Sequence, residues 1–380
     1  MGYGGGGGGG GGSGGSGGGS GSSGGSGYRR VGDDRTANLF VDNVTNRDGN
    51  SGTEVDGIVE VNSTSHFIPP SGTTAERGSR GRGVFMGGRT TPSPNVVDTI
   101  DYITIATNGN ATDFGNLLEN SRYGAGCSSS VRGLYSGGNA PSSVNTIQYI
   151  TISSTGNTFD FGDMTIVRSY HGSTSDGIRG IFAGTWDGKI ANGDKIEYVT
   201  IASKGNGTDF GGVLTVRRQV DNGISNGIRG VFAGGEGTVA EFGSPANINR
   251  IDYINIQSTG VDAQDFGDLP YKAWGVGSTS NKTRGLFAGG FPGSQNEISY
   301  ITIASKGDAI DFGNLSAARA YIPGVSNLIR GVFAGGREPT IVNTIEYVEF
   351  ATLGNAIDFG DLTVARGNLA GFSDSHGGLG

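Results

Sequence analysis

The chain has 380 residues, of which 76 are glycine, and its formal net charge is −8 at pH 7. This acidic balance argues against a nucleic-acid partner, because such a partner calls for a basic face. The single cysteine, Cys127, excludes an intrachain disulfide and a cysteine-based zinc site. The three histidines are far apart in sequence, which argues against a metal cluster. We therefore expect no metal and no cofactor, and we interpret Cys127 as a small buried residue.

The N-terminus shows neither a membrane segment nor a secretory signal. No apolar run in the chain reaches the roughly 18 residues that a membrane-spanning helix requires, so we expect no membrane span. The first residues, MGYGGGG, lack the basic and apolar regions of a signal peptide. We expect a protein that is not exported by that route.

Two segments precede the repeats described below. Residues 1–27 are almost entirely glycine and serine, so flexibility is the default expectation, with an engineered linker or extended packed glycine strands as alternatives. Residues 28–81 contain two stretches with the alternation of strands, at 37–44 and 57–70. The segment is too small and polar to hold a core alone. We expect it to dock on a neighbouring copy or a partner protein.

From Arg82 onward the sequence is periodic, with six units that begin 50, 47, 50, 55 and 46 residues apart. Each unit opens with an RG strand such as RGVFAGG at Arg330. An element of the type TIEYVEF follows, then a DFG element, then a GVSN-like stretch. About four short strands per unit, without helical periodicity, predict the blade of a β-propeller. A solenoid usually has shorter units and needs polar caps. We predict an all-β fold with a six-bladed propeller over residues 82–380, four strands per blade.

Glycines and aromatic residues recur at fixed places in the units. We expect paired glycines such as Gly234 and Gly235 near the central channel, where converging blades leave little room for side chains. Two aromatic series are expected to pack between blades, the second with its hydroxyls on polar partners. The first series is Phe85, Tyr135, Phe182, Phe232, Phe287 and Phe333, and the second is Tyr102, Tyr149, Tyr198, Tyr253, Tyr300 and Tyr347.

The DFG element occurs six times, at Asp113, Asp160, Asp209, Asp265, Asp311 and Asp358. In a protein kinase this motif holds magnesium, but it occurs once, beside a phosphate loop, a strand lysine and an HRD loop. Recurrence indicates architecture instead. We expect the aspartate in a turn, the phenylalanine between blades, and the glycine at a positive φ or a close approach.

A basic residue follows each DFG aspartate by about eight positions, and we expect it to pair with a carboxylate of a neighbouring strand. The series is Arg122, Arg168, Arg217, Lys272, Arg319 and Arg366, with Arg122 and Lys272 displaced by one position. Ring closure is also predicted. The first unit lacks a GVSN-like stretch before Arg82, and residues 367–375 supply a spare copy, so we expect these residues to complete the first blade.

The repeats resemble kelch repeats: VFAGG is similar to the di-glycine strand and IEYVEF to the tyrosine-bearing strand. The DFG phenylalanines stand where the blade tryptophan is usual. The longer pattern RGVFAGG…NTIEYVEFATLGNAIDFGDLTVAR…SDSHGGLG resembles kelch-like virion proteins of marine tailed phages, especially those of cyanobacterial hosts. FIPPSGTTAER resembles phage fibre and tail sequences. The resemblance covers residues 82–380 and implies a component of the virion, assembled in the host cytoplasm.

The leading functional hypothesis is a virion appendage. Residues 1–81 would attach to other virion proteins, as a homo-oligomer in the particle, and the propeller would be displayed for a host-surface glycan or protein. The alternative is a capsid or tail decoration, or a scaffold subunit, that contacts only virion proteins. The loops after the di-glycine strands differ most between units and are the candidate ligand loops. Their candidate residues are Trp186, Asp187, Lys189, Glu236, Glu241, Phe242 and Phe291.

Trp186 and Phe242 are candidates to stack on a sugar or to anchor a protein, and the alternative is that each packs against its own loop. An enzyme is the third class. Kelch-type copper oxidases need a cysteine near a tyrosine together with histidine ligands, and sialidase propellers need arginine triads and Asp-boxes. The sequence matches neither pattern, so we expect no catalytic residues and no enzymatic activity, although a propeller fold alone does not exclude one.

Overall fold

A computed structural model describes residues 81–92, 95–139, 141–185, 195–213, 217–218, 223–237, 246–293 and 295–375. The chain divides into two compact units, Met1–His66 and Phe67–Gly380, and every described residue belongs to the second. The secondary structure of the described part is all strand, without a helix. Accordingly, the described residues contain no helix that is long and apolar enough to cross a membrane. The segments predicted at 1–27 and 28–81 lie outside the described residues, apart from Gly81.

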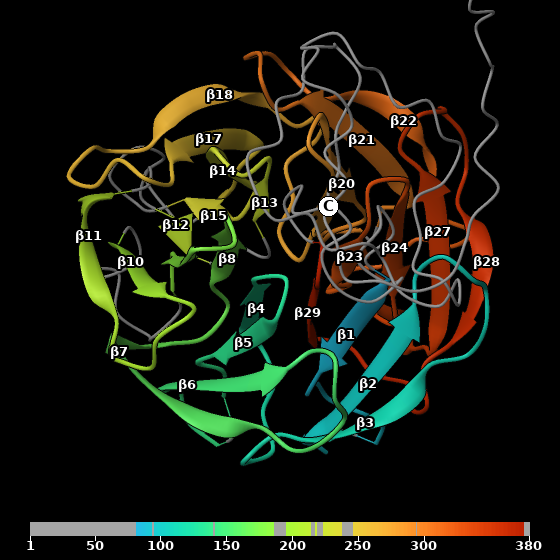
Figure 1. Ribbon diagram of the computed structural model, residues 1–380. Helices are drawn as coiled ribbons and strands as arrows, with labels where there is room; N and C mark the ends of the chain where they lie inside the picture. The colour runs from blue at the N-terminus through green and yellow to red at the C-terminus, as the bar shows by residue number, and fades with distance from the viewer. Residues whose placement is uncertain are drawn as a thin grey trace, which may run out of the picture. The chain divides into compact units, whose positions relative to one another are not determined.

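Six antiparallel sheets of four strands follow one another around a common axis (Figure 1). Named from the innermost strand outward, blade 1 is β29 (Ala370–Ser373), β1 (Arg82–Met86), β2 (Thr99–Thr104) and β3 (Thr112–Asn116). Blade 2 is β4 (Ala125–Ser128), β5 (Arg132–Ser136), β6 (Val144–Thr151) and β7 (Phe159–Arg168). Blade 3 is β8 (Gly172–Ser175), β9 (Arg179–Ala183), β10 (Lys195–Thr200) and β11 (Thr208–Val213).

Blade 4 is β13 (Ile224–Ser225), β14 (Arg229–Ala233), β17 (Arg250–Asn255) and β18 (Gln264–Asp268). Blade 5 is β19 (Gly277–Ser280), β20 (Arg284–Ala288), β21 (Glu297–Thr302) and β22 (Ile310–Asn314). Blade 6 is β23 (Gly324–Ser326), β24 (Arg330–Ala334), β27 (Thr344–Glu349) and β28 (Ile357–Asp361). The prediction of a six-bladed propeller with four strands per blade is confirmed.

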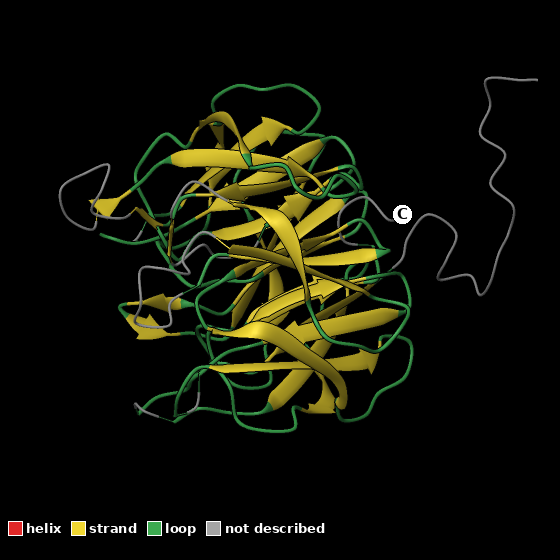
Figure 2. Cartoon of the chain, turned by 90° about the vertical axis from the view of Figure 1, so that its left-hand side faces the viewer, coloured by secondary structure: helices red, strands yellow, loops and turns green. Residues whose placement is uncertain are grey.

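Two small sheets accompany the blades. β12 (Arg217–Arg218), β15 (Glu236–Gly237) and β16 (Ala246–Asn247) form one, and β25 (Arg337–Glu338) with β26 (Thr340–Ile341) forms the other. Both include residues of the segments that follow the second strand of a blade. We call the face that carries these segments the di-glycine face. Figure 2 shows the ring edge-on, with the blade strands running between this face and the opposite one.

The innermost strand of each blade is the GVSN-like stretch, and the RG strand is the second. The prediction that the paired glycines lie beside the channel was therefore wrong. They lie just after the second strand, where Gly234 and Gly235 have φ of 67° and 103°. A Cβ atom on Gly234 would collide with the carbonyl oxygen of Ala273, which belongs to the connection between β18 and β19. The glycines are needed because one blade's turn touches the segment that leads to the next blade.

The predicted closure of the ring is confirmed. β29, near the end of the chain, pairs antiparallel with β1, from Gly83 opposite Ser373 to Met86 opposite Ala370. A bridge between Arg89 and Gly367 extends the pairing. The innermost edge of the first blade is thus paired, which removes an open strand edge from the ring.

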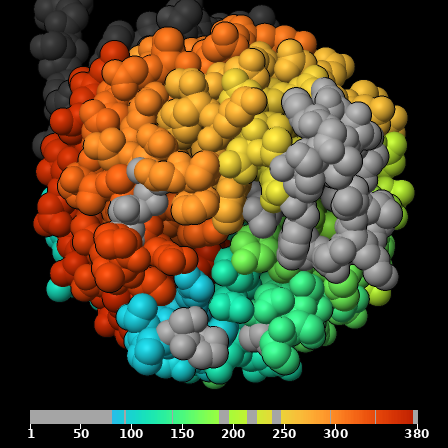
Figure 3. Space-filling view, turned by 180° about the vertical axis from the view of Figure 1, so that it is seen from behind, coloured from blue at the N-terminus to red at the C-terminus, as the bar shows by residue number. Residues whose placement is uncertain are grey.

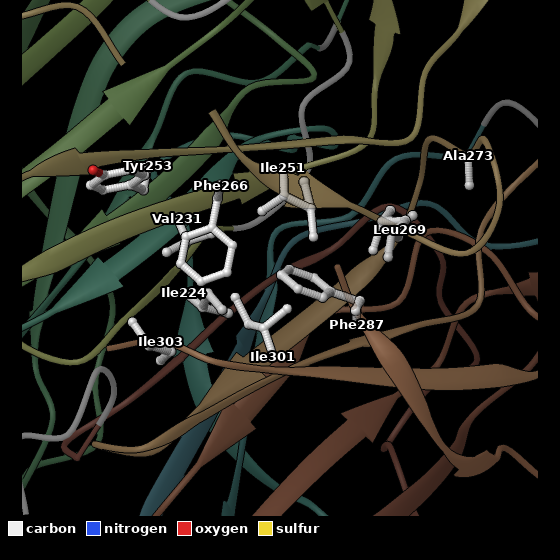
Figure 4. Packing of buried hydrophobic residues seen from close by; sticks show 13 residues of the cluster. Ile224, Val231, Ile251, Tyr253, Phe266, Leu269, Ala273, Phe287, Ile301 and Ile303 are labelled. Carbon is white, nitrogen blue, oxygen red and sulfur yellow. The ribbon is translucent and has the colours of Figure 1, made fainter. Parts of the chain in front are cut away.

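The apolar cores lie between neighbouring blades. In one of them Val231, Ile251 and Phe266 of blade 4 pack against Phe287 and Ile301 of blade 5 (Figure 4). The RG-strand aromatics are at most 1% exposed, so the predicted blade-interface role of this series is confirmed. Complete burial of one such ring stabilises the fold by about 2–3 kcal/mol.

The DFG element lies on the outermost strand, so the prediction of a turn for its aspartate was wrong. Asp113 is exposed and pairs in register with Asp101 of β2. The predictions for the other two residues are confirmed. Phe114 is buried in the core between blades 1 and 2, and Gly115 has a φ of 150°. A Cβ atom there would collide with the carbonyl oxygen of Gly156 in blade 2.

Candidate functional site

Buried arginine–carboxylate pairs join three pairs of adjacent blades. Arg319 and Glu346 are 2.9 Å apart, Arg366 and Asp101 are 2.6 Å apart, and none of these four side chains is more than 2% exposed. Arg168 forms the third pair, with Glu197. Burial lowers the pKa of Arg319 and Arg366, and the partner carboxylate opposes that shift. The predicted pairing is confirmed for these arginines, and each partner lies on the next blade.

Where the basic residue is displaced by one position, at Arg122 and Lys272, the next blade lacks the acid. The position that holds Asp101 or Glu346 is Gln148 in blade 2 and Ser299 in blade 5. Gln148 Oε1 accepts hydrogen bonds from Leu118 N at 2.9 Å and Thr158 Oγ1 at 2.7 Å. The third strand of a blade therefore carries an acid where the basic residue that precedes the blade can reach it. The buried carboxylates of Asp101, Glu197 and Glu346 are parts of the blade seams, and the buried Asp252 pairs with Arg250 of its own strand at 3.4 Å.

The RG arginines form a second set of links, which sequence reasoning missed. Each guanidinium lies over the tyrosine of the third strand of its own blade, 4.3–4.9 Å from the ring centroid. It also donates to a carbonyl of the next blade, as Arg229 Nη1 does to Ile303 O at 2.9 Å. The tyrosine series is consequently covered by cation–π contacts. The hydroxyl of Tyr253 donates to Gln264 Oε1 at 2.6 Å, which confirms the predicted polar partner for this one tyrosine.

Six fully buried serines surround the axis at the end opposite the di-glycine face, which we call the serine face. They are Ser128, Ser175, Ser225, Ser280, Ser326 and Ser373. Five of them donate a side-chain hydrogen bond to the carbonyl of the serine in the preceding blade. The bond from Ser373 Oγ to Ser326 O is 2.6 Å long. These bonds link the innermost strands to one another around the axis.

A ring of left-handed residues surrounds the axis at the di-glycine face. Tyr123, Tyr170, Gly275, Tyr321 and Asn368 each lie five residues before an axial serine, with φ between 51° and 69°. Their backbones are joined in sequence around the axis: Tyr321 N to Gly275 O, Asn368 N to Tyr321 O, Tyr123 N to Asn368 O and Tyr170 N to Tyr123 O, at 2.7–3.3 Å. We call these five residues the axial ring. The equivalent residue of blade 4, at position 220, lies outside the described residues.

The axial ring contains side chains that its backbone does not favour. A left-handed conformation costs a residue with a Cβ atom roughly 1–2 kcal/mol, and tyrosine is not among the residues that adopt it readily. Gly275 fills the same position in blade 5 without that cost. Strained residues that persist where glycine would serve are characteristic of functional sites. Tyr123, Tyr170 and Tyr321 are therefore the leading candidates for a site, whereas asparagine, as at Asn368, adopts this conformation more readily.

These side chains line a hollow on the axis. The space that water-sized molecules can occupy in it is about 20 Å³, room for about one ordered water, and Gly124, His171, Ile322 and Leu369 complete its lining. The rings of Tyr123 and Tyr170 are stacked with centroids 3.7 Å apart, and Tyr321 meets Tyr123 edge-on at 6.4 Å. The Arg122 guanidinium lies 5.0 Å from the Tyr123 centroid. We call this space the axial hollow.

The polar groups of the axial hollow are uncharged. Asn368 is 5% exposed, and neither amide atom has a hydrogen-bond partner within the described structure. His171 Nε2 lies 2.9 Å from Ser136 Oγ, and Nδ1 has no partner among the described residues. Burial, followed by the charge of Arg168, lowers the pKa of His171, so the imidazole is neutral. Burial and the neighbouring Tyr123 raise the pKa of Tyr170. The described lining includes no carboxylate.

Only two of the seven predicted ligand-loop residues lie in the described part of the chain. Phe291 is 41% exposed and packs edge-on against Trp274, with centroids 5.1 Å apart. Trp274 in turn meets Tyr321 at 5.3 Å, so Phe291 is connected to the axial hollow through aromatic contacts. Glu236 lies on β15, opposite Asn247. The predicted residues Trp186, Asp187, Lys189, Glu241 and Phe242 lie outside the described residues.

Sequence reasoning missed the axial ring. The signal that was available is a tyrosine at a constant offset before the serine of the GVSN-like stretch, in three of the six units: Tyr123, Tyr170 and Tyr321. The offset alone does not reveal that these residues meet on the axis, because they are separated by whole blades in sequence.

The serine face bears large exposed apolar side chains. On the serine face, the residue before the RG arginine is a large aliphatic in four blades, 57–68% exposed: Val131, Ile178, Ile228 and Ile329. The first residue of the outermost strand is also apolar and exposed in three blades: Phe159, Ile310 and Ile357. We call these seven residues the apolar rim. Figure 3 shows the opposite, di-glycine face, with the blades in chain order around its middle.

No known protein-family model matches the chain, and no curated protein is similar to it in sequence. Within the described ranges, no three histidine, cysteine, aspartate or glutamate side chains are grouped as metal ligands would be. Cys127 is fully buried and burial raises its pKa, which confirms its interpretation as a small buried residue.

Proposed function

We propose that this chain is a structural protein of a tailed-phage virion whose propeller is displayed for attachment to the host surface. The resemblance of its repeats to kelch-like virion proteins supports the proposal. The observation that supports it most strongly is the distribution of features between the two faces of the ring. The chain enters blade 1 at Gly81, beside Ser373 on the serine face, which also bears the apolar rim. The axial hollow lies on the other face, where the connections that follow the second strands begin.

This distribution of features between the two faces suits an appendage that is anchored through its N-terminal part. Attachment of residues 1–81 to other virion proteins, on the side of the serine face, leaves the di-glycine face directed outward. The apolar rim then supplies surface for contact with virion neighbours, including further copies of the chain in a homo-oligomer. Such a contact also supports the second candidate function, a decoration subunit that binds only virion proteins.

A binding role is a better account of the recurring residues than a catalytic one. The acids Asp101, Glu197 and Glu346 are occupied by blade seams, and the DFG aromatics fill the cores. What remains at the di-glycine face is an uncharged aromatic hollow surrounded by loops that differ between blades. That combination is typical of recognition sites on rigid scaffolds.

The test has two parts, the location of the chain on purified particles and its effect on adsorption. We expect density for a few ring-shaped copies at the tail, and we expect the soluble chain to compete with particles for host cells. Many copies spread over the capsid, without competition, would favour the decoration function. Absence of the chain from particles would contradict both.

Variants can then separate the faces. Trp186→Ala with Phe242→Ala alters the candidate loops, and Ile178→Ser with Ile228→Ser alters the apolar rim. We expect only the loop pair to weaken competition for cells and only the rim pair to weaken incorporation into particles. Unchanged adsorption of the loop pair would exclude these two residues from the attachment surface.

A further inference from the structure

We propose that a hollow in the seam between blades 1 and 2 binds a guanidinium group, supplied by an arginine side chain of a partner protein. We call it the seam hollow, and it is lined by residues 118–121, Gly137, Val144, Thr146 and Gln148. It lies toward the di-glycine face, because Gly137 directly follows the second strand of blade 2. The inference goes beyond the proposed function, since it names the chemistry of one contact and applies to a host protein and a virion protein alike.

The first observation is that the chain's own arginines occupy the same place in three other seams. Between blades 5 and 6, Arg319 Nη1 donates to Gly335 O at 2.9 Å and to Thr344 O at 3.2 Å, and Nη2 pairs with the buried acid of blade 6. Arg366 and Arg168 donate to the equivalent two carbonyls in their seams. One guanidinium thus satisfies two carbonyls and one carboxylate.

A tyrosine takes the place of the arginine between blades 4 and 5. The Tyr271 hydroxyl donates to Gly289 O at 2.9 Å and lies 3.5 Å from Glu297 O. The equivalent carbonyls between blades 1 and 2 are those of Gly137 and Thr146, which both line the seam hollow. No described side chain donates to either carbonyl. The donor that four seams supply from within the chain is therefore absent from this one.

The second observation is that three coordinated changes adapt this seam to the absence of an arginine. Ser121 occupies the position of Arg168, and Gln148 occupies that of the acid. The aromatic residue of the RG strand is Tyr135, where the other five blades have phenylalanine. Its hydroxyl donates to Ser121 Oγ at 2.8 Å. The seam is thus closed by neutral groups, and the space of the guanidinium is left beside them.

The size of the seam hollow suits that group. The space that water-sized molecules can occupy in it is about 70 Å³. A single ordered water needs roughly 10–15 Å³ of such space. Several waters or one planar guanidinium group therefore fit.

The lining also has the chemistry that an arginine side chain requires. A guanidinium only donates hydrogen bonds, which matches the free lone pairs of the two carbonyls. Glu119, an exposed residue of the lining, supplies the carboxylate that Gln148 does not. Leu118, which is 51% exposed, and Val144 offer apolar surface to the methylene groups of the side chain. A lysine ammonium lacks the fork that reaches carbonyls and a carboxylate together.

The probes are the N-acetyl amides of arginine, lysine and citrulline, the last being a neutral isostere of arginine. Binding to the full chain is measured by saturation-transfer NMR and calorimetry. We expect the arginine derivative to bind with a Kd on the order of 1–10 mM, because a single side chain makes few contacts. The lysine and citrulline derivatives should bind at least about tenfold more weakly, since each lacks either the fork or the charge.

Variants at position 119 fill the seam hollow or change its charge. Glu119→Tyr places a hydroxyl where Tyr271 has one, so it should abolish binding without lowering the melting temperature. Glu119→Gln removes only the charge and should weaken binding about three- to tenfold. The matched control is Glu349→Gln, which removes the same charge from an exposed residue at the serine-face end of β27 and should leave binding unchanged. Ser121→Arg with Gln148→Glu fills the hollow independently and should also abolish binding.

Three results would overturn the guanidinium site: the arginine derivative fails to bind, both filled variants bind it as tightly as the unmodified chain, or the lysine derivative binds equally tightly. The partner is tested separately, because Glu119→Tyr should weaken either competition for host cells or incorporation into particles. Binding of the arginine derivative without either effect would overturn the assignment to a partner protein. Failure of all three probes leaves the attachment function to be judged by competition for cells.

Discussion

Replacing Asp101 by alanine is expected to destabilise the ring at the seam between blades 6 and 1. Asp101 and Arg366 are both 0% exposed, and their closest atoms are 2.6 Å apart. The carboxylate also accepts hydrogen bonds from Thr363 N at 3.2 Å and Thr363 Oγ1 at 2.7 Å. Removing one partner of a fully buried pair leaves an uncompensated charge, which costs about 3–5 kcal/mol. That is a large fraction of a typical stability of roughly 5–15 kcal/mol.

The assay is urea unfolding followed by both fluorescence and circular dichroism, whose coincidence would justify a two-state free energy. Asp113→Ala is the matched control, because Asp113 faces Asp101 in register but is exposed. We expect its free energy of unfolding to change by no more than about 0.5 kcal/mol. The double variant Asp101→Leu/Arg366→Met should recover much of the loss, since neither charge remains buried.

A loss below about 1 kcal/mol for Asp101→Ala, or a loss equal to that of Asp113→Ala, would refute this account of the seam. So would a double variant that is less stable than Asp101→Ala. Either result would mean that the acid of the third strand is not retained to neutralise the arginine of the preceding blade.

Two further changes test the fold from other directions. Gly115→Ala should destabilise the chain by about 2–3 kcal/mol more than Gly156→Ala. Both glycines have φ near 150°, but only a Cβ atom on Gly115 collides with a neighbour. Equal losses in the free energy of unfolding, measured in urea, would contradict this. Burial and Arg168 lower the pKa of His171, so the unfolded chain gains a proton below pH of about 6.5 that the folded chain does not. The free energy of unfolding should therefore fall below that pH by up to about 1.4 kcal/mol per unit, and His171→Gln should remove this part of the slope. Identical slopes between pH of about 7 and about 5.5 would show that His171 is not held neutral.

Much of the fold could be predicted because the sequence repeats determine it. Six copies of the same strand pattern fix the blade number, and the spare GVSN-like stretch at 367–375 identifies the closing strand. Residue chemistry at single positions was equally informative for Phe114 and Gly115, since a large ring must be buried and a glycine marks a close approach. The pairing of Arg366 with a carboxylate could be predicted because a buried charge without a partner is costly.

The remaining features depend on contacts between units. Strand order within a blade is not determined by the repeat, and the paired glycines at Gly234 suggested crowding that in fact occurs at a connection rather than beside the axis. The aspartate of the DFG element suits a turn by its own chemistry, but register with β2 places Asp113 on a strand. The axial hollow arises where residues from separate blades, such as Tyr123 and Asn368, meet on the axis.

The closed ring is the central claim, and a disulfide across its seam tests it most directly. Met86 and Ala370 are opposite each other on β1 and β29, and the natural Cys127 is buried. The double variant Met86→Cys/Ala370→Cys should form an intramolecular disulfide on oxidation, seen by mass spectrometry of the monomer, and should gain about 5 kcal/mol of stability from the long loop it closes. Free thiols or only intermolecular disulfides in the oxidised, folded chain would contradict the closed six-bladed ring.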